Sequence, residues 1–334
     1  MPSIESTISP LGLEQEPGRP PMLRLRPGDE QFVWTDEGRQ GLVSALAEHG
    51  AVLIRGLDLR DASGVATVLE RLGAQPAAEK ETFAQRETYA PGVYSASPWP
   101  SNQPMCMHHE LSYTLDPPGL MLFACVTEPA VGGATGVADA AAVLDALPAG
   151  LVERFEREGW LLSRTYNDEI GATLTEAFGT SDKAAVESYC RAHDVSWEWR
   201  PDGSLRTVQR RRAVVRHPVG GRRCWFNQIA FLNEWTLAPE VREYLVEEYG
   251  SDGLPFNTRY GTGDPLTEDV VQLINSAYED HTVSTPWQAG DLLAVDNIRT
   301  AHSRQAYEGP RNVLVGMAAP TRLGNASAAV EGGL

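Results

Sequence analysis

The first part of the chain alternates between a helical spacing of apolar residues and a continuous apolar run. Residues 35–50 begin at Thr35, a good helix N-cap, carry apolar side chains at helical spacing and stop at Gly50. They therefore predict a helix. Residues 51–57, AVLIRGL, form an unbroken apolar run rich in branched side chains, which predicts a buried strand. Residues 61–73 again have the helical pattern and predict a second helix.

Many further strands and fewer helices are predicted beyond this point. Strands are expected over residues 120–130, 160–167, 205–217, 222–232, 311–319 and within 282–307, with an edge strand within 22–34. Helices are expected over residues 182–193, 238–250, 267–281 and 140–158, the last broken at Pro148. Regular βαβ alternation and a Gly-rich turn after the first strand are both missing, which argues against a doubly wound fold. The order favours a mainly β protein, a jelly roll with flanking helices.

Two segments lack strand periodicity. Residues 76–104 are rich in Pro, Ser, Asn and aromatic residues, and we interpret them as a loop that crosses toward the functional site. Residues 168–204 are polar and partly helical, which is typical of an insertion or lid between strands. Both are expected to be poorly ordered until substrate binds and to close over it. The stretch 131–139, VGGATGVAD, is interpreted as a turn.

A single folded domain is expected over residues 22–323. The chain has 334 residues, 42% of them hydrophobic, which is enough for a large core, and it shows no internal repeat or linker. Residues 1–21 are rich in Pro, Glu and Ser, and we predict that they are flexible, as is the tail at 324–334.

The charge and the cysteines limit the class of partner and the compartment. A formal net charge of −17 repels phosphate backbones, so nucleic acids and anionic membranes are poor partners. The sequence contains no stretch of 18 apolar residues, so no membrane-spanning helix is expected. The N-terminus lacks the pattern of a secretory signal. The four cysteines form no C-x-x-C pair and resemble scattered reduced thiols, so a cytoplasmic protein is expected.

Basic residues cluster against this acidic background. The cluster consists of Arg206, Arg210, Arg211, Arg212, Arg216, Arg222 and Arg223. It is either a surface that faces an anion or a solvated strand face, and the sequence leaves both interpretations open. The candidate substrate contacts are Arg210 and Arg212 from this cluster, together with Asn227 and Arg304.

The segment MHHELSY (107–113) has the clearest chemical pattern. In an extended segment residues i and i+2 share a face, so His108 and Glu110 point to one side and His109 points away. An imidazole and a carboxylate on one face are two of the three ligands of a facial triad, which suits Fe(II). The second histidine of such a triad is usually distant in sequence, and His302 follows the apolar run GDLLAVDN. Any one of these histidines alone has a simpler interpretation as a polar residue satisfied by its neighbours.

Two more residues could bind the distal carboxylate of 2-oxoglutarate, which iron oxygenases that use this cosubstrate must hold. Arg311 lies nine residues after His302, and its planar guanidinium suits a bidentate contact. Thr135 lies in GGATGVAD, where its hydroxyl could add a hydrogen bond. Taken alone, Arg311 has a simpler interpretation as a surface arginine, and Thr135 as an ordinary turn threonine.

Taken together, these motifs resemble the TauD/TfdA superfamily. HHELSY, PAVGGATGVAD and PWQAGDLLAVDNIRTAHSRQAYEGPR follow each other in the order and at the spacing of that superfamily. RYGTGDPLTEDVV, CWFNQ and HSRQAYEGPR resemble its SyrP-like, clavaminate synthase-like branch, in which many members modify amino acids in natural-product pathways. The resemblance covers roughly residues 40–320.

The resemblance implies a double-stranded β-helix (jelly-roll) core and the use of Fe(II), 2-oxoglutarate and O2. The positions that match the iron ligands are His108, Glu110 and His302, and those that match the 2-oxoglutarate ligands are Thr135 and Arg311. The carboxylate ligand is Glu where TauD itself has Asp, and the SyrP-like branch shares the Glu.

The chain departs from the family pattern in two places. Many relatives place the arginine further beyond the distal histidine and add a second one, where this chain has Leu314 and Val315. The branch often has Asn at the position of His109, so the role of His109 stays open.

The activity implied by the resemblance is hydroxylation of an unactivated C–H bond of an amino acid, free or tethered to a peptidyl carrier domain. The same cofactor chemistry can also desaturate, epoxidise or cyclise a substrate, and the sequence does not separate these outcomes. A halogenase is disfavoured, because Glu110 occupies the position that must be left open for chloride. A non-catalytic metal-binding barrel is a further alternative. A zinc hydrolase ranks below it, because no H-E-x-x-H helix is present.

Overall fold

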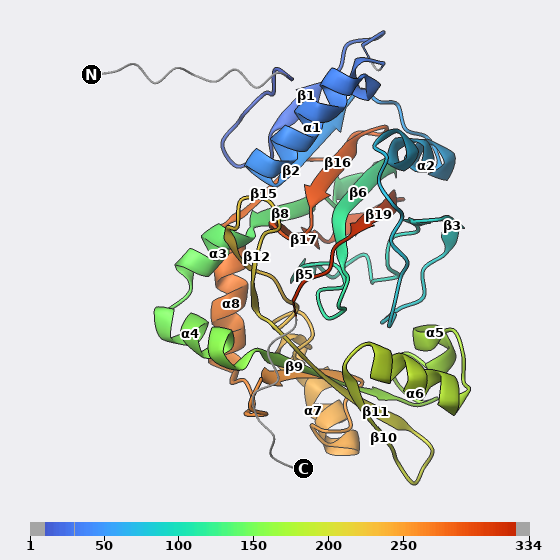
Figure 1. Ribbon diagram of the computed structural model, residues 1–334, viewed down its shortest axis with the longest axis vertical. Helices are drawn as coiled ribbons and strands as arrows, with labels where there is room; N and C mark the ends of the chain where they lie inside the picture. Colours follow the sequence, from blue (N-terminus) through green and yellow to red (C-terminus); the bar gives the residue numbers. More distant parts are fainter. Residues whose placement is uncertain (1–10, 30, 325–334) are drawn as a thin grey trace.

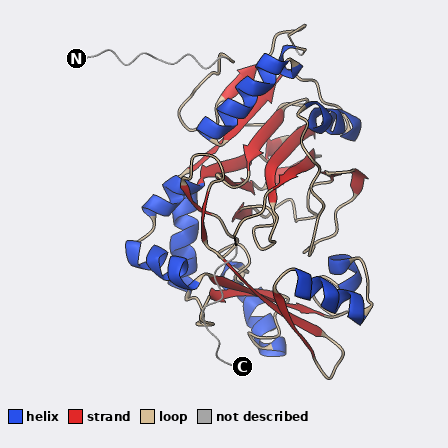
Figure 2. Ribbon diagram, in the orientation of Figure 1, coloured by secondary structure: helices blue, strands red, loops and turns tan. Residues whose placement is uncertain are grey.

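Two β-sheets that share one hydrophobic core form the centre of the computed structural model, which describes residues 11–29 and 31–324 (Figures 1 and 2). The larger sheet has the strand order β1 (Met22–Arg24), β2 (Ala51–Arg55), β16 (Leu292–Asp296), β6 (Pro118–Thr127), β19 (Asn312–Pro320), β4 (Val93–Tyr94) and β3 (Thr88–Ala90). The smaller sheet has the order β15 (Thr282–Ser284), β8 (Thr135–Asp139), β17 (Thr300–Arg304) and β5 (Met105–His108). Strands β1 and β2 pair in parallel, whereas the other neighbours in these sheets are antiparallel.

The larger sheet is covered on both faces, which explains its continuous apolar runs. In β2, Ala51 and Leu53 face the core between the sheets, whereas Val52 and Ile54 face a second cluster beneath two helices. These helices are α1 (Asp36–His49) and α2 (Ala62–Arg71), beside the strands at the top of Figure 1. The side chain of Thr35 accepts a hydrogen bond from Gly38 N, and Gly50 ends α1 with φ of 77°. The predicted helix and its two end signals are thus confirmed.

A third sheet lies at the opposite end of the molecule from α1 (Figure 1). Its strand order is β10 (Val195–Trp199), β11 (Leu205–Arg211), β9 (Trp160–Tyr166) and β14 (Phe256–Tyr260). The helices α5 (Leu174–Phe178) and α6 (Lys183–Ala192) pack on it around Val186, Cys190 and Leu205. The predicted insertion at 168–204 therefore has a small core of its own and adds strand β10 to the sheet.

The other elements connect these three sheets. The remaining helices are α3 (Ala140–Ala146), α4 (Ala149–Glu158), α7 (Pro239–Tyr249) and α8 (Glu268–Asp280), with short 3-10 turns at Phe32–Trp34 and Glu234–Thr236. Two small ribbons pair β12 (Val214–Arg216) with β13 (Arg223–Trp225) and β7 (Val131–Gly132) with β18 (Tyr307–Glu308). Pro148 separates α3 from α4, as the sequence predicted. No helix among the described residues has the length and the apolar character to cross a bilayer.

Four predictions of local structure were wrong. Residues 76–104 are not a continuous loop, because β3 and β4 form within them and β4 pairs with β19 of the larger sheet. Residues 131–139 are not one turn, because Gly132 and Gly133, both with φ of 68°, reverse the chain between β7 and β8. The strand predicted over 222–232 ends at Trp225, and the following residues form turns. The strand predicted over 205–217 is divided into β11 and β12, each of which pairs with a different sheet.

The chain ends bear on the predicted domain limits. Residues 1–10 and 325–334, within the segments predicted to be flexible, lie outside the described residues. Leu11 is buried in the cluster under α1, and Glu14 forms an isolated bridge with Met22. Packing against the larger sheet therefore begins before residue 22.

Candidate metal centre and its cavities

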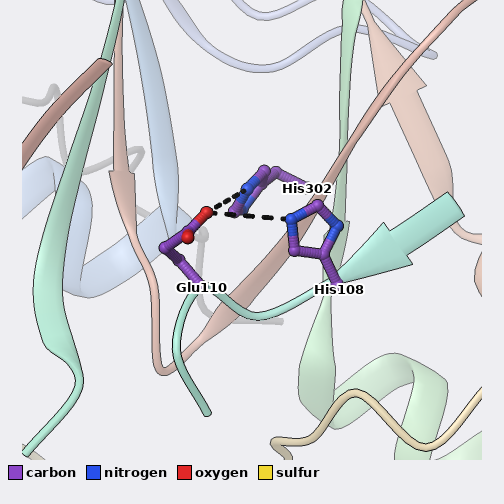
Figure 3. A group of neighbouring side chains, drawn as sticks. All are labelled: His108, Glu110 and His302. Atoms are coloured by element: carbon purple, nitrogen blue, oxygen red, sulfur yellow. Dashed lines mark ion pairs between the residues drawn. The ribbon is translucent and has the colours of Figure 1, made fainter. Parts of the chain in front are cut away.

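Three buried side chains converge at the edge of the smaller sheet, as Figure 3 shows. His108 ends β5, and His302 lies directly opposite it on β17. Glu110 follows two residues later, and its Oε2 atom lies 3.8 Å from Nε2 of His108 and 3.6 Å from Nε2 of His302. The three ligand atoms all lie within 4.8 Å of one another, which is the spacing of groups that could hold one metal ion. The structure thus brings together the three residues that the sequence singled out.

The turn after β5 gives Glu110 its direction. The sequence pattern predicts an extended stretch here, but β5 stops at His108 and Glu110 belongs to a turn in which Leu111 has φ of 51°. Asn297, fully buried in the turn between β16 and β17, holds the backbone of Glu110 through hydrogen bonds of its side chain. A short turn fixed in this way places Glu110 on the same side as His108 without continuing the strand.

Electrostatics prepares the three groups for a divalent cation. Burial lowers the pKa of His302 to about 4, so this imidazole is neutral at pH 7 and can donate a lone pair. Nδ1 of His108 lies 2.9 Å from the carbonyl of Cys106, which leaves Nε2 directed at the cluster. Burial alone would raise the pKa of Glu110, but Arg86 and the two imidazoles outweigh it and hold this pKa well below its ordinary value. Two imidazoles and one carboxylate are the donor set of a facial triad, which fits Fe(II).

Arg86 is a site residue that no sequence pattern predicted. Its Nη2 donates to Oε1 of Glu110 at 3.1 Å, so Oε2 is left to face the histidines. Its Nε donates to Ser97 Oγ at 3.0 Å. Arg86 lies just before β3, in a stretch where no periodic pattern marks any position, and its contact with Glu110 depends on the tertiary fold. No sequence signal distinguishes it from the other arginines.

His109 points away from the cluster, as predicted. Its Nδ1 lies 2.6 Å from the carbonyl of Asn297, and its ring packs against Phe226. Burial lowers its pKa to about 3, so the ring is neutral. His109 borders neither of the two cavities beside the cluster.

The cluster lies between these two cavities. The larger has a volume of about 510 Å³ and borders His108 and Glu110. Its walls come mainly from residues 79–113 and 228–238 and include Phe83, Trp99, Phe231 and Phe256. The smaller has a volume of about 50 Å³ and borders all three residues of the cluster, together with Thr135 and Arg311. The insertion 168–204 borders neither cavity.

Arg311 is a partly buried cation beside the smaller cavity. Its Nε donates to the carbonyl of Gly133 at 3.0 Å, and among the described residues no carboxylate forms an ion pair with it. Burial, and then the nearby Arg304, lower its pKa to about 10, which leaves it charged at pH 7. Thr135 lies on β8 opposite Arg304 and borders the same cavity. A partly buried guanidinium without a counter-ion, which shares a cavity with a hydroxyl, fits an anionic ligand such as a carboxylate.

The residues predicted to contact substrate have other partners in the structure. Arg210 donates to the carbonyl of Gly261, and Asn227 donates to the carbonyl of Ala213 at 3.1 Å. Neither residue, nor Arg212, borders the two cavities beside the cluster. Arg304 borders the smaller cavity, and its guanidinium donates to the backbone carbonyls of residues 99, 100 and 103.

The arginine cluster of residues 206–223 is largely engaged in contacts within the chain. Arg206, Arg222 and Arg223 pair with Asp252, Asp139 and Glu156. Arg211 is buried and donates to the carbonyls of Tyr113 and His193. These contacts favour a structural interpretation of most of the cluster.

Comparisons with known proteins find a family and relatives that match most of this chain. The family described as taurine catabolism dioxygenase TauD, TfdA family, matches residues 24–318. The chain is 33% identical over 275 residues to dapdiamide synthesis protein DdaC of Enterobacter agglomerans, which covers 82% of this chain and 84% of that protein. It is 29% identical over 287 residues to a clavaminate synthase-like protein of Arabidopsis thaliana, covering 83% of each.

Solved structures share the fold. A taurine dioxygenase from Burkholderia xenovorans superposes with a TM-score of 0.56 at 16% identity, covering 94% of this chain and 91% of that one. AAD-2, in complex with Mn(II) and N-oxalylglycine, superposes with a TM-score of 0.53 at 17% identity, covering 93% and 98%. These likenesses confirm the predicted jelly-roll core with flanking helices.

Proposed function

Because the chain belongs to the TauD/TfdA family of Fe(II)- and 2-oxoglutarate-dependent dioxygenases, we propose that it hydroxylates an unactivated C–H bond of an amino acid. The observation that carries this proposal is the buried cluster of His108, Glu110 and His302 between a large apolar cavity and a small cavity with a free cation. A relative named for dapdiamide synthesis supports a role in making a natural product.

We assign the iron to His108, Glu110 and His302, and the distal carboxylate of 2-oxoglutarate to Arg311 and Thr135. When bound, iron and 2-oxoglutarate activate O2 and couple decarboxylation of the cosubstrate to oxidation of the substrate. The small cavity extends from the cluster to Arg311, so a cosubstrate anchored there would reach the metal position.

The side chains around the cluster orient the ligands and keep water out. Arg86 binds one oxygen of Glu110 and so directs the other toward the histidines. Phe231 stacks on His108 with ring centroids 4.5 Å apart and an interplanar angle of 14°. Apolar walls of this kind exclude water and favour reaction with a substrate carbon held next to the metal position.

The experiment that tests the proposal is a substrate screen. The purified chain, supplied with Fe(II), 2-oxoglutarate and O2, is assayed for succinate release with each of the twenty amino acids, free and loaded on a peptidyl carrier domain. We expect at least one of them to accelerate succinate release and to gain one oxygen atom, as seen by mass spectrometry. A product that has lost two hydrogen atoms would show that the reaction is desaturation or cyclisation instead of hydroxylation. A full screen without any acceleration would overturn the proposal, and His302→Ala is the inactive control.

A further inference from the structure

A second carboxylate lies in the wall of the larger cavity. Oε1 of Glu79 is 3.4 Å from Nε of Arg86, and the two side chains are 16% and 9% exposed. Both residues border the cavity on the side of the metal cluster, because Arg86 also binds Glu110. The polar end of this cavity therefore carries a carboxylate and a guanidinium side by side.

The contact between Glu79 and Arg86 is longer than a strong ion pair. A charge-assisted hydrogen bond between such groups is about 2.7–2.9 Å long, shorter than the contact between Glu79 and Arg86. Nη1 of Arg86 is buried and has no hydrogen-bond partner among the described residues. Burial raises the pKa of Glu79, and the opposing effect of Arg86 does not cancel this rise. Both groups thus retain unused capacity, Glu79 for a cation and Arg86 for an acceptor.

Most other polar groups of this cavity are already engaged. The hydroxyl of Thr236 donates to backbone carbonyls, and Nε2 of Gln228 donates to the carbonyl of His109. The hydroxyl of Tyr113 contacts the carbonyls of Lys80 and Glu81. The rest of the wall is mainly apolar or aromatic. A ligand with one charged end and one apolar end would match this division.

We infer that Glu79 and Arg86 bind the head group of a free α-amino acid, with its ammonium group on Glu79 and its carboxylate on Nη1 of Arg86. An α-amino acid carries both charges on one carbon, as the adjacent acid and base require. This inference rests on the proposed function and narrows it. A carrier-bound amino acid has a thioester in place of the carboxylate and would leave Nη1 of Arg86 without its partner.

Matched derivatives test the head group. Each amino acid that accelerates succinate release is compared with its α-N-acetyl derivative, its α-carboxamide and its thioester with N-acetylcysteamine. We expect each derivative to have a KM higher by about tenfold to a hundredfold, because each removes one charge-assisted contact. A derivative that is turned over as well as the free amino acid overturns the inference and leaves the oxygenase function intact.

Substitution of Glu79 tests the residue. Glu79→Gln keeps the shape and removes the charge, so we expect the KM for the free amino acid to rise about tenfold or more with a smaller change in kcat. The preference for the free amine over the N-acetyl derivative should shrink by a similar factor in this variant, which a merely structural role would not produce. Glu87→Gln is the matched control, because Glu87 is an exposed glutamate of the same loop whose carboxylate accepts from Tyr89.

The outcomes separate the two claims. An unchanged preference for the free amine in Glu79→Gln overturns the assignment of Glu79, even where the wild type prefers free amino acids. Failure of every free, acetylated and thioester compound to accelerate succinate release overturns the proposed substrate class together with the inference. Binding of Fe(II) and 2-oxoglutarate, followed by their charge-transfer absorption, reports separately whether the site itself is formed.

Discussion

The side-chain oxygen of Asn297 accepts a hydrogen bond of 2.8 Å from the backbone amide of Glu110. The side-chain amide of Asn297 donates in turn to the carbonyl of Glu110 at 2.9 Å and to that of Pro118 at 2.8 Å. These contacts join the turn after β5 to the turn between β16 and β17. They therefore fix where Glu110 lies relative to His302, because β17, which carries His302, follows the second turn.

Replacement of Asn297 should damage both stability and metal binding. Asn297→Ala removes three hydrogen bonds and leaves buried backbone groups unpaired, so we expect unfolding to become easier by about 3 kcal/mol or more. Affinity for Fe(II) should fall as well, because Glu110 loses its support. Urea unfolding and metal titration measure the two effects. Asn167→Ala, which removes only two contacts to a local turn, is the control, and equal losses in both variants would contradict this role for Asn297.

The assignment of the metal ligands predicts which substitutions remove iron and activity. His302→Ala should abolish turnover and reduce the iron bound per folded chain to background, because two ligands hold the ion far more weakly than three. His109→Ala should keep the iron, since its ring contacts Asn297 and lies outside both cavities. Metal content after gel filtration is the measurement. Full activity of His302→Ala would refute the assignment, and loss of iron in His109→Ala would show that the opposite face carries a ligand.

Arg311 should matter for the cosubstrate far more than for the metal. Loss of a buried bidentate pair costs on the order of 2–5 kcal/mol, so Arg311→Ala should raise the KM for 2-oxoglutarate by about thirtyfold or more. Arg216→Ala, which removes an exposed arginine, should leave this KM unchanged. Initial rates over a range of 2-oxoglutarate concentrations decide the matter. An unchanged KM in Arg311→Ala would mean that another cation holds the distal carboxylate.

Substrate should order one of the two irregular segments much more than the other. Residues 79–106 supply much of the wall of the larger cavity, whereas residues 168–204 border neither cavity and pack around their own core. We therefore expect hydrogen exchange in 79–106 to slow when a substrate amino acid is added to the enzyme loaded with Fe(II) and 2-oxoglutarate. Exchange in 168–204 should change less. Equal exchange of 79–106 in the two states would argue that the cavity wall is already fixed.

The ion pair of His217 with Asp296 gives stability a defined pH dependence. Nε2 of His217 lies 2.8 Å from Oδ2 of Asp296, and this hydrogen bond raises the pKa of His217 above its ordinary value of 6.5. The folded state then holds the proton more tightly, so the stabilisation is full below about pH 6.5 and is lost as the pH rises through the raised pKa. The difference in unfolding free energy between the wild type and His217→Gln should be larger at about pH 6 than at about pH 9. A constant difference would refute the link.

The sequence predicted the elements whose pattern reflects burial on defined faces. The run AVLIRGL was recognisable because β2 is covered on both sides. His108 and Glu110 were paired on the expectation of a continuous strand, whereas β5 stops at His108 and a turn brings Glu110 to the same side. Thr135 was misplaced in a turn, since its neighbours are small and Gly-rich, and only pairing of β8 with β15 and β17 makes it a strand residue.

Residues whose role depends on the crossing of distant segments escaped prediction. Arg86 meets Glu110 because residues 76–104 fold back against the turn after β5, and nothing local encodes that path. The sequence placed Arg206 and Arg210 in one basic cluster, but not their distance from the site: neither borders the two cavities, because β11 is positioned by its pairing with β9 in the third sheet. Pattern thus reveals which side chains share a face, and tertiary packing decides what that face meets.

Arg304 holds the wall of the cavity by main-chain oxygens alone, at residues 99, 100 and 103. Every amino acid offers such an oxygen, so this attachment does not depend on which side chains the loop carries. The side chains at residues 99, 100 and 103 can therefore change by mutation while the hydrogen bonds from Arg304 are kept. An ancestor built in this way could give rise to descendants that oxidise different molecules with the same strands and the same metal position, and directed evolution in the laboratory has the same freedom.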